Sequence, residues 1–511
     1  MFSISKEKNK KNIIKYAVLI VFSTLVFKGL GFVKQAVVAF YYGAALETDI
    51  FYSAYNLIID SSRSIIKNFG IALIVVYSSV KGNKEKKELD KLVSIIFKIL
   101  IVFSVILSLS FFIFSKQIAS IISINLASTN LELLSNTISI LSFVYLFLAF
   151  QLIGSSILNA EKDYFYPRLE SAIISICAIL SCLILKKYLN IGALIVSTYL
   201  STLIFSFILW RKSSRYIKIS LLKIEFTDDV LKVIKLALPL VIGDLFMQLI
   251  ITMNRNIGFS IGEGAVSALN YANTLVDFVK TVFITSLSEM LLSYFSNLRS
   301  SNNEQKLLSN TIKAINIILC VLIPISIISY FNSENIVRIV YFRGAFDEKG
   351  VSLTSSALSG YMLCFPALAV INTISNNLFA NQQTKKPMIF QVLVYGIMIF
   401  PTYLLAKEFG TFGIALGYSI ATYVYLIFIL VLFRKRNKEF RIKDTMTIVL
   451  KYVIAIIPIM IMVKLIVGLN IDGIIEFGLS SIVGFVVFEI EMYLLGEKDL
   501  FNIVNKYLKL N

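Results

Sequence analysis

Fourteen long apolar segments constrain this chain more than any other feature of its sequence. A helix that crosses a bilayer needs about 20 mostly apolar residues, and the strands of a membrane barrel would instead alternate over about ten residues. Several of the segments exceed the length of one crossing, so these helices must tilt, kink or protrude. We therefore expect an all-α polytopic membrane protein with about 14 transmembrane helices. The segments are 13–42, 50–79, 92–115, 131–160, 168–186, 190–210, 229–258, 266–297, 311–331, 351–380, 387–406, 411–433, 447–469 and 473–496.

The composition excludes several classes of protein. Hydrophobic residues make up 57% of the 511 residues and charged residues only 16%, whereas a soluble domain is about 45–50% apolar and about 25% charged. Histidine is absent, which removes imidazole bases and histidine metal ligands. The four cysteines lie in apolar runs without CxxC spacing and are interpreted as structural thiols. We expect no metal site and no cofactor.

The basic residues predict the orientation of the chain. Its net charge is +18, and most of its 49 lysines and arginines fall in alternate connections. Anionic lipid headgroups and the positive-inside rule explain this pattern, so we expect no nucleic-acid partner. The basic connections are assigned to the cytoplasm, and both termini then lie there, which agrees with an even number of helices. These connections are the N-terminal tail, 80–91, 161–168, 211–235, 298–313, 381–386, 434–444 and the C-terminal tail.

A weak internal repeat predicts the domain organisation. The stretch SSILNAEKDYFYP at 155–167 is similar to SNNLFANQQTKKP at 375–387. This spacing predicts two pseudo-symmetric six-helix lobes of the same topology, 1–212 and 213–434, followed by a C-terminal helix pair and tail at 435–511. Paired lobes of this kind are typical of transporters, whose site lies between the lobes.

Charged residues inside the apolar segments mark candidate binding positions, because each costs about 2.5–3.5 kcal/mol to insert. The first lobe carries Lys28, Lys34, Asp49 and Arg63 in this way, and Asp60, three residues before Arg63, can pair with it. Cations predominate among these charges. They predict a basic chamber suited to an anion with several charged oxygens, such as a diphosphate.

The second lobe adds a smaller set of charges. Arg255 falls at the repeat position of Lys34, and matching cations in two lobes suit a pyrophosphate that bridges the midline. Asp244 follows a proline and a glycine that loosen its backbone. It is either a Na⁺ or H⁺ coupling site or the structural partner of a nearby cation. Asp277 and Lys280, spaced i,i+3, can satisfy each other.

Four stretches carry a resemblance to a known family. They are KGLGFVKQAVVAFYYGAALETDIFYSAYNL at 28–57, NRNIGFSIGEGAVSALNYANTL at 254–275, YFRGAFDEKG at 341–350 and NQQTKKP at 381–387. In this order they resemble the MurJ/MviN lipid II flippases of the multidrug/oligosaccharidyl-lipid/polysaccharide exporter (MOP) superfamily. The resemblance covers nearly the whole chain. It implies a MATE-like fold that works by alternating access in the bacterial inner membrane.

The resemblance also implies a cargo and a site. The cargo would be lipid II, the undecaprenyl-diphosphate-linked peptidoglycan precursor, moved from the cytoplasmic to the outer leaflet. Lys28 and Lys34 occupy the two motif arginine positions, and Asp49 occupies the motif aspartate. Arg63 matches a second-helix arginine, and Arg255 matches the arginine of an Asp-Arg pair. The last helix pair would form a groove for the lipid tail. Expected partners are lipid II and membrane lipids, with the protein a monomer.

Several residues depart from the family pattern. Lys67 and Asn68 stand where the family has Glu-Gly, Asn254 replaces the aspartate of Asp-Arg, and Thr274 replaces an arginine. A flippase for another lipid-linked oligosaccharide, of O-antigen, capsule or teichuronic type, therefore stays open. Coupling to Na⁺, H⁺ or the membrane potential is also open.

The residues disfavour two of three further alternatives. A MATE-type cation or drug antiporter should have an acidic or aromatic cavity, which the first-lobe cations oppose. A membrane-embedded transferase needs a general base and often an acidic metal-binding pair, and the chain has neither histidine nor a DxD motif. A scaffold that keeps the fold without transport remains compatible with the missing second-lobe arginine. We therefore expect a transporter and not an enzyme.

Overall fold

The computed structural model describes residues 26–27, 29–83, 85–123, 126–218, 226–285, 291, 295, 304–380, 385–437, 442–469 and 472–496. These residues are almost entirely helical, and none of them forms a strand. The predicted all-α class is thereby confirmed. Lys28 and both chain ends lie outside the described residues, so their predicted roles and orientation remain predictions.

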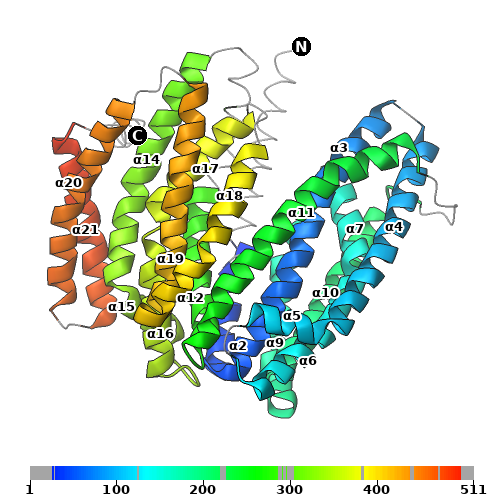
Figure 1. Ribbon diagram of the computed structural model, residues 1–511, viewed down its shortest axis with the longest axis horizontal. Coiled ribbons are helices and arrows are strands. Elements are labelled where there is room, and N and C mark those ends of the chain that lie inside the picture. The colour runs from blue at the N-terminus through cyan, green and yellow to red at the C-terminus, as the bar shows by residue number, and fades with distance from the viewer. Residues whose placement is uncertain are drawn as a thin grey trace, which may run out of the picture. The chain divides into compact units, whose positions relative to one another are not determined.

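The chain divides into two compact units, 1–267 and 268–511 (Figure 1). Among the described residues of the first unit, a helix over 29–42 precedes ten further α-helices. Two of them, α3 and α11, pack along each other. These helices are α2 (Leu46–Tyr55), α3 (Ser61–Asn83), α4 (Lys86–Ile113), α5 (Ser115–Ile122), α6 (Ser128–Ser142), α7 (Leu148–Ala160), α8 (Phe165–Arg168), α9 (Glu170–Leu189), α10 (Gly192–Ser213) and α11 (Asp228–Asn256).

The exposed faces of these helices are as apolar as the buried ones. In α4, Leu92, Ile96 and Leu100 recur at helical spacing and are buried. Farther along the same helix, Ile106 is 58% exposed and Ile113 is 64% exposed. A helix that is hydrophobic all round is stable at a protein surface only where lipid replaces water.

The boundary between the units falls inside α12 (Ala265–Lys280). The second unit contains α12 from residue 268 onward and the helices that follow it. The C-terminal helices α20 and α21 pack side by side, and α14 contacts both. The elements are α14 (Glu304–Phe331), α15 (Ser333–Tyr341), α16 (Glu348–Met362), α17 (Phe365–Ala380), α18 (Lys385–Ile397), α19 (Ile399–Arg436), α20 (Ile442–Val467) and α21 (Gly473–Leu494).

Within the described ranges, nine helices are long and apolar enough to cross a membrane, or ten if the bent pair of α16 and α17 is one span. The two helices of that pair meet at 46°. The two segments predicted at 387–406 and 411–433 are separated at Gly410, whose φ of 57° breaks the helical conformation inside α19. Such a left-handed φ favours glycine. The polytopic architecture agrees with the sequence, and the count of fourteen stays a prediction.

The two compact units do not coincide with the predicted lobes, because the first unit also includes α11. The reason is the packing of α11 along α3, a contact that a sequence repeat does not reveal. The lobe boundaries at 212 and 434, which were predicted from the internal repeat, remain predictions.

Candidate functional site

A π-helical turn lies between α2 and α3 and positions the first charged residues. It spans Asn56–Asp60 and interrupts a helix that otherwise continues from Leu46 to Asn83. Wide turns of this kind are rare and often occur at functional sites. Asp60 ends the π turn, and Arg63 follows it by three residues in α3.

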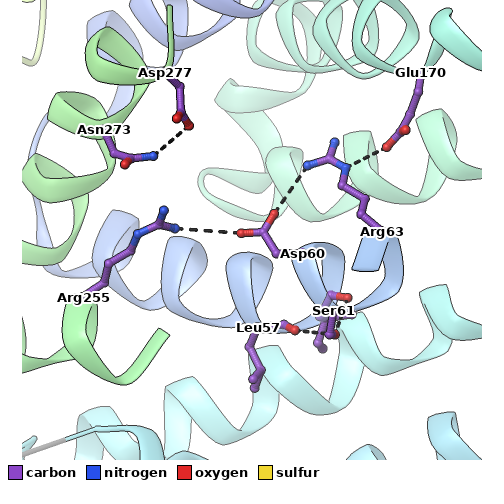
Figure 2. A network of polar contacts seen from close by, with 9 residues as sticks. Leu57, Asp60, Ser61, Arg63, Glu170, Arg255, Asn273 and Asp277 are labelled. Atoms are coloured by element: carbon purple, nitrogen blue, oxygen red, sulfur yellow. Dashed lines mark hydrogen bonds and ion pairs between the residues drawn. The ribbon is translucent and has the colours of Figure 1, made fainter. Parts of the chain in front are cut away.

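Asp60 connects two arginines from different helices (Figure 2). Its Oδ1 lies 3.5 Å from Nη1 of Arg63, and its Oδ2 lies 3.9 Å from Nη1 of Arg255 in α11. Arg63 also donates from Nε to Oε1 of Glu170, the first residue of α9, at 2.7 Å. We call Asp60, Arg63, Glu170 and Arg255 the arginine network. The prediction that Asp60 pairs with Arg63 is confirmed.

The arginine network is balanced in charge and only partly buried. Two guanidinium groups face two carboxylates, and the side chains of Arg63 and Arg255 are 38% and 16% exposed. Ion pairs at this degree of exposure contribute only about 0–1 kcal/mol each. A guanidinium carries five N–H donors, and an incoming anion with several oxygens can use the same donors. The network therefore holds its arginines weakly enough for exchange.

The space beside Arg63 is small in this structure. A pocket of about 30 Å³ is lined by Arg63, Glu170, Gln151 and Thr198, among other residues. One water molecule needs about 10–15 Å³ on this measure. The pocket therefore admits two or three waters and no diphosphate, so a large anion reaches Arg63 through the exposed part of its side chain.

Asp244 in α11 is bound by α3 through neutral donors. Its Oδ2 accepts hydrogen bonds from Ser64 Oγ at 2.6 Å and from Asn68 Nδ2 at 2.8 Å. No group of three or more histidine, cysteine, aspartate or glutamate side chains able to hold a metal ion occurs among the described residues. Asp244 thus links α11 to α3. Its predicted role in ion coupling stays a prediction.

Asp49 has a structural role in this conformation. The residue is fully buried, with 0% exposure. Its Oδ2 accepts from the backbone N–H of Gly264 at 2.7 Å and its Oδ1 from that of Ser267 at 2.6 Å. The carboxylate therefore fixes the start of α12, where unpaired N–H groups favour an anion. The predicted binding role of Asp49 is not tested by this arrangement and stays a prediction.

Two other lysines singled out from the sequence, Lys34 and Lys280, lie outside the arginine network. Lys34 is partly buried in the helix over 29–42 and lies within electrostatic range of Cys182 in α9. In the second unit, Lys280 Nζ lies 4.0 Å from Asp277 Oδ1, which agrees with the predicted pair. Asn273 Nδ2 also donates to Asp277, at 3.0 Å (Figure 2).

Sequence reasoning missed Glu170 and the role of Asn68. Glu170 is an acidic residue inside the apolar segment at 168–186. Because inserting a charged side chain into a membrane costs free energy, its position there could have predicted a cationic partner. Asn68 was noted only as a departure from the family pattern. It proves to be a donor to Asp244, and no local signal identifies a partner 176 positions away.

An all-helical membrane fold with guanidinium groups balanced by carboxylates inside it is typical of membrane transporters. The family model described as "Lipid II flippase MurJ" matches residues 38–487. This chain belongs to the lipid II flippase MurJ family.

Named relatives and solved structures agree with this placement. The "probable lipid II flippase MurJ" of Buchnera aphidicola subsp. Schizaphis graminum is 27% identical over 447 residues, which cover 85% of this chain and 86% of the relative. The Aquifex aeolicus protein of the same description is 24% identical over 415 residues, covering 78% and 79%.

Two solved structures show the fold. The inward closed conformation of a lipid II flippase MurJ matches with a TM-score of 0.77 at 24% identity, covering 93% of this chain and 98% of that one. An inward-facing MATE family multidrug transporter of the MOP superfamily matches with a TM-score of 0.71 at 15% identity, covering 81% and 94%. The predicted MOP/MATE-like fold is confirmed.

Proposed function

We propose that this protein translocates lipid II from the cytoplasmic to the outer leaflet of the bacterial cell membrane by alternating access. Membership of the MurJ family supports the cargo. The observation in the structure that carries the proposal is the convergence of Arg63 and Arg255 on a single carboxylate. Two guanidiniums that one aspartate can bridge are also close enough to share the two phosphates of a diphosphate.

In this proposal Arg63 and Arg255 bind the diphosphate. Arg–phosphate contacts are charge-assisted and often bidentate, and a diphosphate offers the two arginines more charged oxygens than the carboxylates that it would replace. Asp60 and Glu170 neutralise the arginines when no cargo is bound. Lys34, and Lys28 outside the described residues, supply further positive charge. The saccharide remains in the cavity during transit, and the lipid tail stays in the membrane beside the C-terminal helix pair.

The transport step is a rocking motion of two helical bodies about the binding site. The division of the chain into two compact units supports it. The basic connections support a cytoplasmic position for both termini. The protein acts as a monomer, with no cofactor and no enzymatic activity.

Energy for the return step comes from an ion gradient or from the membrane potential. Asp244 is the candidate for Na⁺ or H⁺ coupling, because it is the acidic side chain that joins α3 to α11. In proteoliposomes, replacing Na⁺ by K⁺ and changing the pH gradient separate these cases. Flipping rates that ignore both gradients would leave the membrane potential, which is worth about 2.3 kcal/mol per charge and 100 mV.

Complementation tests the function. A bacterium depleted of its own lipid II flippase receives the intact chain, Arg63→Gln or Arg255→Gln at matched expression, with Lys187→Gln as a control at an exposed position in α9. We expect growth with the intact chain and the control, and loss of growth with both arginine variants. Arg63→Lys, which keeps the charge and loses the fork, should rescue poorly.

The other outcomes have definite meanings. If both arginine variants rescue growth, lipid II stays the cargo and the proposed site is wrong. If the intact, membrane-inserted chain does not rescue, lipid II is not its cargo, and the departures at Lys67 and Thr274 become the first residues to exchange.

A further inference from the structure

A second charged cavity lies where four helices of the first unit end, away from the arginine network. Its volume is about 290 Å³, many times the 10–15 Å³ that one water needs. It is bordered by the end of α3, the start of α4 and the residues after α7 and α10. The residues lining it are Tyr77, Lys81, Lys86, Leu89, Glu161, Arg215 and Tyr216. We call it the basic cavity.

The acidic residue of the basic cavity already has two partners. Lys81 Nζ lies 2.5 Å from Glu161 Oε2, and the Tyr77 hydroxyl donates to Glu161 Oε1 at 2.6 Å. Burial alone would raise the pKa of Glu161, but hydrogen bonds from Lys81 and Tyr77 outweigh it and lower the pKa below its ordinary value. Glu161 is therefore ionised at neutral pH, and its charge is matched by that of Lys81.

Lys86 and Arg215 leave an excess of positive charge on the lining. Both side chains are exposed, and with Lys81 they give three cations against one carboxylate. Glu85 and Glu88 are also nearby in the sequence, but they are exposed and are not among the described residues that line the cavity.

The start of α4 adds to this excess. Lys86 is the first residue of a 28-residue helix that has no side-chain cap. Its first-turn N–H groups and its dipole favour an anion at this end. The helix terminus, the cations and the cavity are independent features that favour the same kind of ligand.

We propose that the basic cavity binds a phosphate-type oxyanion. The ligand belongs either to the headgroup of an anionic phospholipid or to a soluble phosphate compound. Lys86 and Arg215 contact its oxygens, while Lys81 is paired with Glu161 beside them. The connections that form the cavity are the basic ones that the positive-inside rule assigns to the cytoplasm, so the ligand is recognised on that side. This binding site is separate from the proposed cargo site and does not depend on lipid II as the cargo.

The test measures binding to the full-length protein in detergent by native mass spectrometry. Phosphatidylglycerol is titrated as the lipid probe, with phosphatidylcholine for comparison, and inorganic pyrophosphate is the soluble probe. The variant Lys86→Gln/Arg215→Gln removes two cations from the cavity. The matched control, Lys116→Gln/Lys187→Gln, removes two exposed cations from α5 and α9. Glu161→Gln removes the only carboxylate among the described residues that line the cavity.

We expect the cavity variant to bind its probe about 30-fold more weakly, since each cation near a lipid surface contributes roughly fivefold. The control should bind as the native chain does, and Glu161→Gln should bind at least as tightly. A loss confined to phosphatidylglycerol identifies a lipid headgroup, and a loss confined to pyrophosphate identifies a soluble ligand. Equal binding of both probes by the native chain and the cavity variant overturns the proposal, as does equal weakening by the control.

Discussion

Replacing Asp60 by asparagine separates two roles that the arginine network can have. If Asp60 competes with the cargo for Arg63 and Arg255, its removal should strengthen anion binding. If it belongs to the binding surface, its removal should weaken binding. Asparagine keeps the size of the side chain and removes the charge that lies 3.5 Å from Arg63 and 3.9 Å from Arg255.

The size of the effect follows from these two ion pairs. The carboxylate of Asp60 is 28% exposed, so each pair contributes about 0–1 kcal/mol. The variant should then lose at most about 2 kcal/mol of stability, and an anion should gain up to the same amount in affinity. We expect inorganic pyrophosphate to bind about 5- to 30-fold more tightly to Asp60→Asn than to the native chain, because about 1.4 kcal/mol corresponds to a factor of ten.

Isothermal titration of the detergent-solubilised protein with pyrophosphate measures this affinity. Glu170→Gln frees only Arg63 and should give a gain of about fivefold or less. Glu132→Gln, an exposed position in α6, controls for the loss of one negative charge. Unchanged or weaker binding by Asp60→Asn refutes competition between Asp60 and the anion. Equal gains in Asp60→Asn and Glu132→Gln would assign the effect to net charge alone.

Three further predictions concern the stability of the fold, each followed by thermal unfolding with fluorescence from Trp210, the only tryptophan. Asp49→Ala should destabilise the protein by about 3 kcal/mol or more, since two backbone N–H groups lose a charged acceptor worth about 1.5–3 kcal/mol each; a loss under 1 kcal/mol contradicts the buried role. The pKa of Glu161 is lowered on folding. The ionised carboxylate therefore contributes fully to folding stability above the unfolded pKa of about 4.3, and this contribution is lost as pH falls through the folded pKa. Glu161→Gln should therefore reduce the dependence of stability on pH in that acid range. An unchanged dependence would show that Glu161 does not contribute to it. Gly360→Ala should cost about 1–3 kcal/mol because its Cβ would lie 2.7 Å from that of Ala415, whereas Gly478→Ala, with open space around it, should cost nothing.

The sequence predicts interactions within one helix and apolar faces better than contacts between helices. The pairs of Asp60 with Arg63 and of Asp277 with Lys280 follow from helical spacing, and both are present. The partner of Arg63 in α9 and the donors to Asp244 join residues more than 100 positions apart. These contacts depend on which helices are neighbours and on how each helix is rotated about its axis. A segment that is hydrophobic on every face determines neither its neighbours nor its rotation.

Asp49 illustrates a different limit. Its place in a charged, glycine-containing motif indicated a functional residue, because an aspartate inside an apolar segment is costly. The structure satisfies that cost with two backbone N–H groups at the start of α12. Whether such a charge serves a ligand or a helix terminus depends on a contact between distant segments, so the local sequence cannot distinguish the two.

The charge balance of the site also predicts how the membrane potential acts on transport. Without cargo, the two arginines are matched by Asp60 and Glu170. A diphosphate adds two negative charges, and any lysine that accompanies it reduces the charge that moves. An inside-negative potential drives negative charge outward, so removing a moving lysine should make outward flipping more dependent on voltage.

Lys34→Gln tests this reasoning in proteoliposomes with a valinomycin-set potential. The moving charge becomes more negative by one, which is worth at most about 2.3 kcal/mol per 100 mV, or roughly 50-fold in rate if the whole potential is crossed. We expect the ratio of flipping rates with and without the potential to be several-fold larger in Lys34→Gln than in the native chain, and unchanged in Lys187→Gln. The same ratio in all three proteins would mean that Lys34 stays in place while the cargo crosses, so the arginines alone accompany the diphosphate.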